Sequence, residues 1–289
     1  MRRVIFLVII VALSLHAIKP LKDYVTTPDS VGIKYEEVSF KTKDDLNLAG
    51  WFLPAQDTSG NISKGKKPVI IITLADAGNI SYMLWYYGNF FHSEEWHTFL
   101  FDWRGFGHSD PWPVLRDSTR KVMDLIYPEY IYDLHAAIDF IKKRPEVDSK
   151  RIGLFGRSMG AVIILSTVSQ RDDIAAVMVD GAFTTMAEVL GKLSAVDDWG
   201  YRIPHGYPAE LEPLWAAKKI KAAVFLVTGE NDDRCTADMA RRIYANLNAP
   251  KEIWIVPNSG HKIDNMPPII ATDEYRKRVY KFFSKFLKF

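Results

Sequence analysis

The chain has 289 residues, of which 48% are hydrophobic and 25% charged, and its formal net charge is +2. This balance is typical of a globular protein with a sizeable core, and the small net charge gives no reason to expect a nucleic-acid partner. The single cysteine, Cys235, excludes an intramolecular disulfide and a zinc site built from several cysteines.

The N-terminus has the layout of a secretory leader. Met1-Arg2-Arg3 is basic, and the apolar run Val4–Leu15 follows it. The run is shorter than the ~20 apolar residues of an ordinary membrane span. We therefore expect residues 1–18 to be a signal peptide or an uncleaved signal-anchor, with a buried core helix as the remaining alternative. In the first two cases the protein is exported or membrane-anchored, and this segment contacts the membrane.

Residues 30–289 read as one domain in which strands and helices alternate. Two strand-like segments at its start, 35–40 and 46–53, predict an antiparallel hairpin. The alternation that follows predicts βαβ units, a mostly parallel sheet and helices on both of its faces. The predicted strands are 69–74, 98–102, 151–155, 175–179, 223–228 and 252–256, and the predicted helices are 82–93, 130–144, 159–169, 237–247 and 273–287.

The clearest motif follows the predicted strand 151–155. Gly156-Arg157-Ser158-Met159-Gly160 is G-x-S-x-G between a strand and a helix. In that setting the serine occupies a sharp, strained turn that lifts its hydroxyl above the helix N-terminus. The alternative is a glycine-rich turn with a capping serine. We interpret Ser158 as a nucleophile.

A serine nucleophile needs a base that is held by an acid, and here the expected chain order is serine, acid, histidine. The loop after strand 223–228 contains Asp232 and Asp233, and the loop after strand 252–256 contains His261. His261 is the one histidine after the acid. His108 is a competitor, although it precedes the serine. Position in the chain alone does not decide whether Asp232 or Asp233 is the acid.

Three stretches resemble the α/β-hydrolase superfamily, in particular serine hydrolases with a small cap, including esterase-like and S33-type members. They are "FDWRGFGHSD" (101–110), "RPEVDSKRIGLFGRSMGA" (144–161) and "VDGAFTTM" (179–186), and the resemblance runs from about Tyr35 to the C-terminus. It implies the α/β-hydrolase fold and a Ser-Asp-His triad of Ser158, Asp232 and His261. Asp232 is selected because the family places its acid three residues after the loop glycine.

The resemblance also implies an oxyanion hole. Relatives carry H-G-N-A-G-N-I-S where this chain has "LADAGNIS" (74–81), so the leading His-Gly is lost. The backbone N–H groups of Asp76 and Met159 are the expected donors. An ionised carboxylate at Asp76 would oppose the oxyanion. We expect that side chain to face away from the hole, or to cap the helix that starts near Ile80.

A short cap is expected within residues 184–215. Its rings are either aromatic walls for an acyl group or packing for the cap itself, and the segment 109–130 is long enough to overhang the site. The four rings are Trp199, Tyr201, Tyr207 and Trp215.

These features predict a serine hydrolase that cleaves a carboxylic ester of a small molecule through an acyl-enzyme, without a cofactor or metal. A thioesterase is one alternative, and so is a peptidase that holds a free amine with Glu188 or Asp197. A pseudo-hydrolase or binding module is supported only by the altered 74–76 turn. The sequence does not indicate the oligomeric state.

Overall fold

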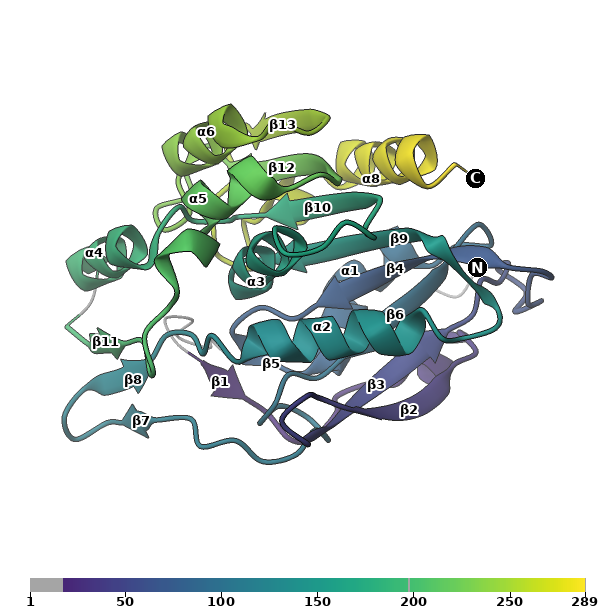
Figure 1. Cartoon of the computed structure of the whole chain (residues 1–289), viewed down its shortest axis with the longest axis horizontal. Helices are drawn as coiled ribbons and strands as arrows, with labels where there is room; N and C mark the ends of the chain where they lie inside the picture. The colour runs from purple at the N-terminus through teal and green to yellow at the C-terminus, as the bar shows by residue number, and fades with distance from the viewer. Residues whose placement is uncertain (1–17, 197, 289) are drawn as a thin grey trace.

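The computed structural model describes residues 18–196 and 198–288, and its centre is an eight-stranded sheet (Figure 1). The strand order is β13-β12-β10-β9-β4-β6-β3-β2. β2 and β3 form the predicted antiparallel hairpin, β3 is antiparallel to β6, and the remaining neighbours are parallel. The sheet strands are β2 (Glu36–Lys41), β3 (Asn47–Leu53), β4 (Lys67–Thr73), β6 (His97–Phe101), β9 (Val147–Arg157), β10 (Ala176–Asp180), β12 (Ala223–Gly229) and β13 (Lys251–Val256).

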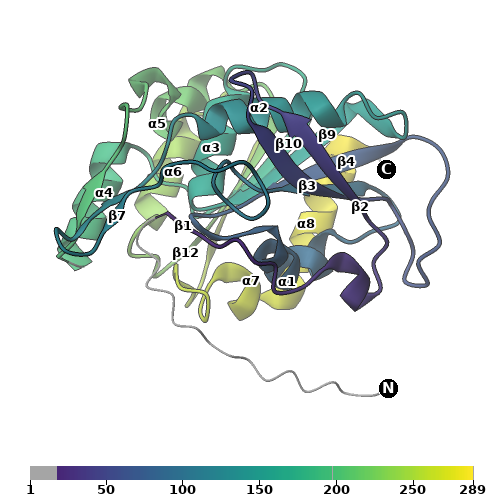
Figure 2. The ribbon, with the colours of Figure 1, turned by 90° about the horizontal axis from the view of Figure 1, so that it is seen from below.

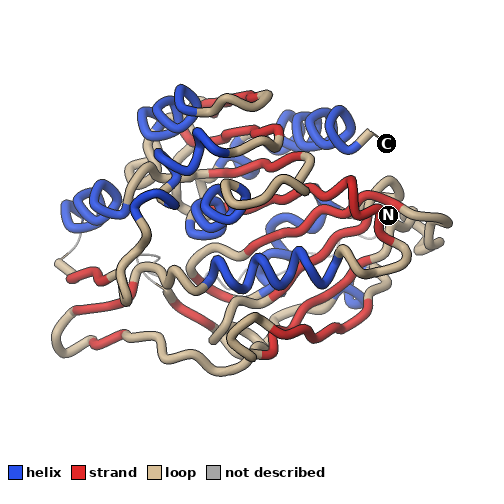
Figure 3. The backbone as a smooth tube through the Cα atoms, in the orientation of Figure 1, coloured by secondary structure: helices blue, strands red, loops and turns tan. Residues whose placement is uncertain are grey.

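The middle strands read as unbroken apolar runs because helices cover both of their faces. Every residue of β4 after Lys67 is buried, and so is every residue of β10 and β12. Figures 2 and 3 show α1, α7 and α8 on one face of the sheet and α2, α3, α5 and α6 on the other. The helices are α1 (Ile80–Phe91), α2 (Tyr130–Ile141), α3 (Met159–Val168), α4 (Met186–Val196), α5 (Pro213–Ala216), α6 (Ala237–Asn246), α7 (Pro267–Ile270) and α8 (Thr272–Leu287), with 3₁₀ turns η1 (Pro28–Val31), η2 (Ala209–Leu211) and η3 (Ala217–Lys219).

Helix α3 is buried on all sides, as its apolar sequence predicts, because it lies between the sheet and its helical neighbours. Helix α8 is amphipathic and buries one face against the sheet. A Cβ added at Gly153 would lie 2.8 Å from the ring of Phe283, so this glycine permits the close approach of helix to strand. The predicted mostly parallel α/β architecture is confirmed.

The cap is built from two segments that lie far apart in the chain. Strands β7 (Arg116–Asp117) and β8 (Val122–Asp124) belong to the long segment 109–130, and β11 (Gly200–Arg202) belongs to the expected cap. They form a three-stranded sheet in which β8 lies between β11 and β7. Figure 1 shows this sheet and α4 together at one end of the molecule. The segment 109–130 is therefore half of the cap.

The first described residues already belong to the body. Ile18 is 1% exposed and is part of the hydrophobic core, so the packed chain begins before residue 30. Strand β1 (Lys19–Pro20) then pairs in parallel with β5 (Ala77–Gly78), which lies in the turn after β4. The predicted leader itself lies outside the described residues, apart from Ile18. Among the helices of residues 18–196 and 198–288, none is long and apolar enough to cross a membrane.

Candidate active site

Ser158 sits in the strained turn that its motif predicts. Its backbone has φ 53° and ψ −118°, between the end of β9 and the first turn of α3. Such a positive φ costs an L-residue free energy, and the surrounding structure has to enforce it. The glycines of the motif allow this: a Cβ at Gly156 would lie 2.3 Å from Thr73 Oγ1, and one at Gly160 would lie 2.4 Å from the carbonyl oxygen of Leu74. The packing therefore leaves no room for a side chain on either side of Ser158.

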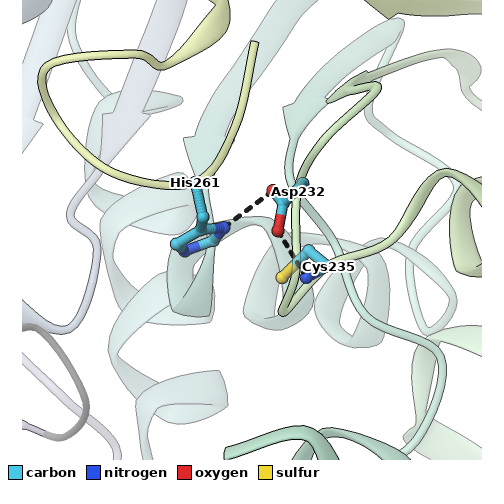
Figure 4. Close-up of side chains that lie close together, drawn as sticks. All are labelled: Asp232, Cys235 and His261. Atoms are coloured by element: carbon cyan, nitrogen blue, oxygen red, sulfur yellow. Dashed lines mark hydrogen bonds and ion pairs between the residues drawn. The ribbon is translucent and has the colours of Figure 1, made fainter. Parts of the chain in front are cut away.

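Two loops bring His261 and Asp232 to this serine. Ser158 Oγ is 3.2 Å from His261 Nε2, and His261 Nδ1 is 2.8 Å from Asp232 Oδ2 (Figure 4 shows the second contact). His261 and Asp232 are 7% and 5% exposed, so little water competes for these hydrogen bonds. Asp233 is exposed. His108 stacks on Tyr24 and is not the partner of Ser158.

Asp232 is held as an anion inside the protein. Burial alone would raise the pKa of this carboxyl, but the charge and hydrogen bond of His261 hold the pKa below its usual value, with help from two backbone N–H groups. Those groups belong to Arg234 and Cys235, and they donate to Oδ1 at 3.0 and 2.7 Å. With Oδ1 occupied, Oδ2 remains to accept the Nδ1–H of His261. This arrangement fixes the orientation of the imidazole and its tautomer.

Three further buried side chains, which no motif in the sequence identifies, support His261 and Ser158: Arg157, Asp180 and Tyr275. The Arg157 guanidinium is buried and donates to the backbone carbonyl of His261. Burial raises the pKa of Asp180 to about 6 despite the nearby charge of Arg157. Tyr275 Oη donates to Asp180 Oδ2 at 3.1 Å, and the N–H of Ser158 donates to the carbonyl of Asp180 at 2.9 Å. Arg157 occupies a variable position of G-x-S-x-G, and Asp180 ends a strand at the edge where ligands bind in such sheets.

The turn after β4 is tied down by remote parts of the chain. The N–H of Lys19 donates to the carbonyl of Asp76 at 2.7 Å, and the N–H of Leu21 donates to the carbonyl of Gly78 at 3.0 Å. Trp103 Nε1 donates to the carbonyl of Leu74 at 3.2 Å. The segment Ile18–Leu21, called the N-terminal strap below, thus supports the turn that carries Asp76.

Asp76 does not cap helix α1. The N–H of Ile80 is bound by Asp102 Oδ1 at 2.9 Å, and the N–H of Ser81 by Asn79 Oδ1 at 3.1 Å. Asp76 instead lines the same pocket as Ser158 and Met159. The expectation that Asp76 caps the helix is wrong, because Asp102 and Asn79 occupy that role, and the alternative that its side chain faces away from the hole stays a prediction.

Asp102 is the buried carboxylate of the D-x-R-G stretch. It also accepts a hydrogen bond from Tyr24 Oη at 2.6 Å and one from the backbone N–H of His108 at 3.3 Å. Burial raises the pKa of Asp102 to about 6, against these hydrogen bonds. Asp102 therefore joins the turn, helix α1 and the segment after the N-terminal strap through a single side chain.

The pocket beside Ser158 has mainly apolar walls with one acidic and one basic residue. Leu125 and Ile126 directly follow β8, Phe183 directly precedes the expected cap, and Val189 and Leu193 belong to α4. Its described lining does not include Trp199, Tyr201, Tyr207 or Trp215, so of the two alternatives these rings do not form the walls of this pocket. Tyr207 Oη bonds Ser166 at 2.7 Å, and Trp215 is 46% exposed. The lining residues are Asp76, Leu125, Ile126, Ser158, Met159, Phe183, Val189, Leu193, Arg234, Cys235 and His261.

The amine-binding acid expected of a peptidase is engaged elsewhere. Glu188 accepts hydrogen bonds from Thr184 Oγ1 and from the Arg242 guanidinium. Asp197, the second candidate, lies outside the described residues. Among the residues that the structure describes, one group of side chains has the ligand atoms for a metal ion: Asp232, Cys235 and His261.

The fold and this constellation define the class of protein: an α/β hydrolase with a short cap over a serine–histidine–aspartate arrangement. The chain belongs to the prolyl oligopeptidase family, whose sequence model matches residues 128–289. It is therefore a hydrolase of the superfamily that its motifs predict.

Relatives match most of the length of the chain. The chain is 28% identical over 249 residues to the YfhR protein of Escherichia coli O157:H7, which covers 86% of this chain and 80% of that protein. It is 24% identical over 277 residues to the alpha/beta hydrolase domain-containing protein WAV2 of Arabidopsis thaliana, covering 92% of this chain and 83% of the other.

Solved structures share the fold. The esterase Pf2001 of Pyrococcus furiosus superposes with a TM-score of 0.73 at 20% identity, over 94% of this chain and 98% of the esterase. A puromycin-hydrolyzing peptidase of Mycobacterium tuberculosis superposes with a TM-score of 0.70 at 16% identity, over 89% of this chain and 40% of the peptidase.

Proposed function

We propose that the protein hydrolyses a carboxylic ester through an acyl-enzyme formed on Ser158. The observation that carries the proposal is the continuous hydrogen-bonded series from Ser158 Oγ through His261 to Asp232, at the edge of a mainly apolar pocket. A buried serine–imidazole–carboxylate series is the arrangement that turns an unreactive hydroxyl into a nucleophile.

In the first half-reaction Ser158 Oγ attacks the ester carbonyl carbon while His261 Nε2 takes the hydroxyl proton. The resulting imidazolium is stabilised by Asp232, which keeps its negative charge. The oxyanion accepts hydrogen bonds from the backbone N–H groups of Met159 and Asp76. As the tetrahedral intermediate collapses, the C–O bond to the leaving group breaks and His261 gives its proton to the departing alkoxide.

The second half-reaction repeats these steps with water. His261 removes a proton from a water molecule that attacks the acyl carbonyl, and the new intermediate expels Ser158 Oγ, which recovers its proton from His261. The products are a carboxylic acid and free enzyme. The aliphatic side chains of Leu125, Ile126, Val189 and Leu193 suit an apolar acyl or alcohol group in the pocket.

A peptidase is the second candidate, since the family and one structural neighbour carry that description. We place it second because Glu188, the described acid that was expected to hold a substrate amine, is engaged by Thr184 and Arg242. We also propose that the enzyme is exported or membrane-anchored, because residues 1–18 have the layout of a signal peptide or a signal-anchor.

A fluorophosphonate probe and a series of p-nitrophenyl esters test the proposed function. We expect the probe to label the parent protein, and Ser158→Ala to abolish both labelling and ester hydrolysis. Asp232→Asn should lower turnover by about 10⁴-fold, as loss of the acid does in comparable triads, whereas the exposed Asp233→Asn is the matched control and should change little.

Retained esterase activity in a folded Ser158→Ala protein would reject the nucleophile. An equal loss of turnover in Asp233→Asn would reject Asp232 as the acid. Faster cleavage of aminoacyl p-nitroanilides than of esters would make the peptidase the better description.

A further inference from the structure

Cys235 lies close to Asp232 and His261, the two side chains of the proposed proton relay. Its Sγ, a carboxylate oxygen of Asp232 and a ring nitrogen of His261 all lie within 4.8 Å of one another, and all three residues are buried. Figure 4 shows Asp232 between the imidazole and the cysteine. The proposed hydrolysis makes no use of the thiol.

We propose that Asp232, Cys235 and His261 form an inhibitory site for a zinc-type divalent cation. Sulfur, imidazole nitrogen and carboxylate oxygen are the three ligand types that Zn²⁺ takes in proteins, and a site with three protein ligands leaves a fourth position for water. Magnesium and calcium select sets of oxygen ligands, and these residues do not offer one.

The geometry requires only a small adjustment. Bonds of about 2.0–2.3 Å to a tetrahedral ion place neighbouring ligand atoms roughly 3.3–3.8 Å apart. The present 2.8 Å between His261 Nδ1 and Asp232 Oδ2 must therefore open, and any separation near the 4.8 Å limit of the cluster must shorten by at most about 1 Å. Changes of this size are within the reach of side-chain rotation at Cys235 and His261, and the proposal requires them.

The turn itself holds two of the ligands in place. Asp232 Oδ1 accepts the backbone N–H groups of Arg234 and Cys235, so the carboxylate and the thiol start from a single fixed loop. The carbonyl of Cys235 is held by Thr228 Oγ1 at 2.7 Å. Such bonds around a ligand set reduce the entropy lost when an ion binds.

The charges balance when the ion enters. Cys235 and Asp232 are both buried, and a zinc-type ion binds cysteine as the thiolate, so the thiol must give up its proton. Binding replaces that proton, and the thiolate and the Asp232 carboxylate then neutralise the two charges of the ion. A neutral cluster is tolerated in a buried site where an isolated ion would not be. The nearby Arg157 guanidinium still opposes a cation, so we expect binding that a chelator reverses.

Inhibition follows from the tautomer, and this step rests on the proposed function. The free enzyme needs the imidazole proton on Nδ1 and a lone pair on Nε2 that faces Ser158. An ion on Nδ1 moves the proton to Nε2, and the thiol proton leaves to solvent. A protonated Nε2 cannot accept the proton of Ser158, so the nucleophile stays unactivated. Cys235, His261 and Ser158 all line the pocket, which provides a path for the ion.

The test uses the tag-free parent protein with Cys235→Ser and Cys235→Ala. Calorimetry measures Zn²⁺ binding, and the inhibition of ester hydrolysis by Zn²⁺ is expressed relative to each variant's own activity. We expect binding and inhibition by Zn²⁺ in the parent, reversal by a chelator, and no effect of Mg²⁺. Loss of the sulfur ligand should weaken both by at least about tenfold in each variant.

Co²⁺ provides a readout that is independent of catalysis. Bound to the parent or to Ser158→Ala, it should show a thiolate charge-transfer band that both Cys235 variants lack. Equal Zn²⁺ affinity in parent and variants would overturn the site, and so would a Co²⁺ spectrum without the band. Binding with the band but without inhibition would overturn the inhibitory role. If Ser158→Ala retains hydrolysis while the band depends on Cys235, the proposed function fails and the metal site stands.

Discussion

The two proposed oxyanion donors are positioned in opposite ways. The N–H of Met159 belongs to the first turn of α3, and a short stretch of chain, from Gly156 to Gly160, sets its place. The N–H of Asp76 belongs to a turn held by the N-terminal strap, by Trp103 and by Asp102, which are all distant in sequence. A local motif therefore builds one half of the hole and long-range contacts build the other, so different substitutions should break each half.

The largest effect is expected at Gly160, on the local side. In Gly160→Ala the new Cβ would lie 2.4 Å from the carbonyl oxygen of Leu74. Because that oxygen belongs to the backbone, the clash can be relieved only if the Ser158 turn shifts. We expect a loss of about 3 kcal/mol in the free energy of unfolding and a fall in turnover of about 100-fold. Chemical denaturation and p-nitrophenyl ester kinetics measure the two quantities.

Gly191 provides the matched control for that substitution. It lies in α4, and a Cβ there meets nothing within 4 Å. Gly191→Ala should leave turnover unchanged and raise the free energy of unfolding slightly, because alanine favours a helix. Similar behaviour of the two alanine variants would contradict the account of the Ser158 turn.

The next effect concerns Asp102, on the long-range side. Its pKa is about 6 in the folded protein, above the usual value of an unfolded chain, so between about pH 4 and pH 6 the folded state holds the extra proton. Stability from this group is present below pH 4 and is lost as the pH rises through 6. Asn cannot titrate. The parent-minus-variant difference in unfolding free energy for Asp102→Asn should therefore fall by about 2–3 kcal/mol from pH 4 to pH 7. Parallel pH curves for the two proteins would exclude this buried titration.

A smaller and more selective effect is expected at Lys19. Lys19→Pro removes the N–H that donates to the carbonyl of Asp76, while Lys19→Ala keeps it. We expect the proline variant to lose about tenfold in kcat, roughly the worth of one hydrogen bond, with KM and melting temperature little changed. A transition-state analogue that forms a tetrahedral adduct should lose affinity in parallel. If the alanine variant loses as much, the side chain and not the N–H is responsible.

The smallest effect is expected at Asp76 itself. Asp76 lines the pocket with Ser158, and an ionised carboxylate there would oppose the proposed oxyanion; Asp76→Asn removes that charge while keeping the backbone donor. We expect turnover of an activated ester to rise a few-fold, since Arg234 lines the same pocket and offsets part of the charge. A steep fall in turnover would show that the carboxylate acts in catalysis or binds substrate.

The contrast between local and long-range contacts also decides how much of the structure the sequence could predict. Apolar runs such as that of β4 predict the central strands, and the strand–turn–helix setting of Ser158 predicts its strained backbone, because both depend on neighbouring residues. The order serine, acid, histidine also predicted that Ser158, Asp232 and His261 lie together. Their catalytic roles stay predictions.

Features made by remote contacts left no comparable pattern. The cap sheet joins strands of two or three residues from separate segments, and β1 has only two residues, so neither forms a periodic pattern. Asp76 does not cap α1 because Asp102 and Asn79 accept hydrogen bonds from the first N–H groups of that helix. The sequence therefore identified the residues of that turn but not the long-range contacts that hold it.

The N-terminal strap has a consequence for the order in which the protein is made. Residues 18–21 leave the ribosome well before their partners at Asp76, Gly78, Gly107 and Asp124, and before His261, which follows later still. Contacts of such sequence separation form slowly, because a long loop must close before they yield any stability. A nascent chain that ends before residue 261 has Ser158, the proposed nucleophile, without His261, its proposed base. During synthesis the activity should therefore remain off until the last part of the chain has folded into place.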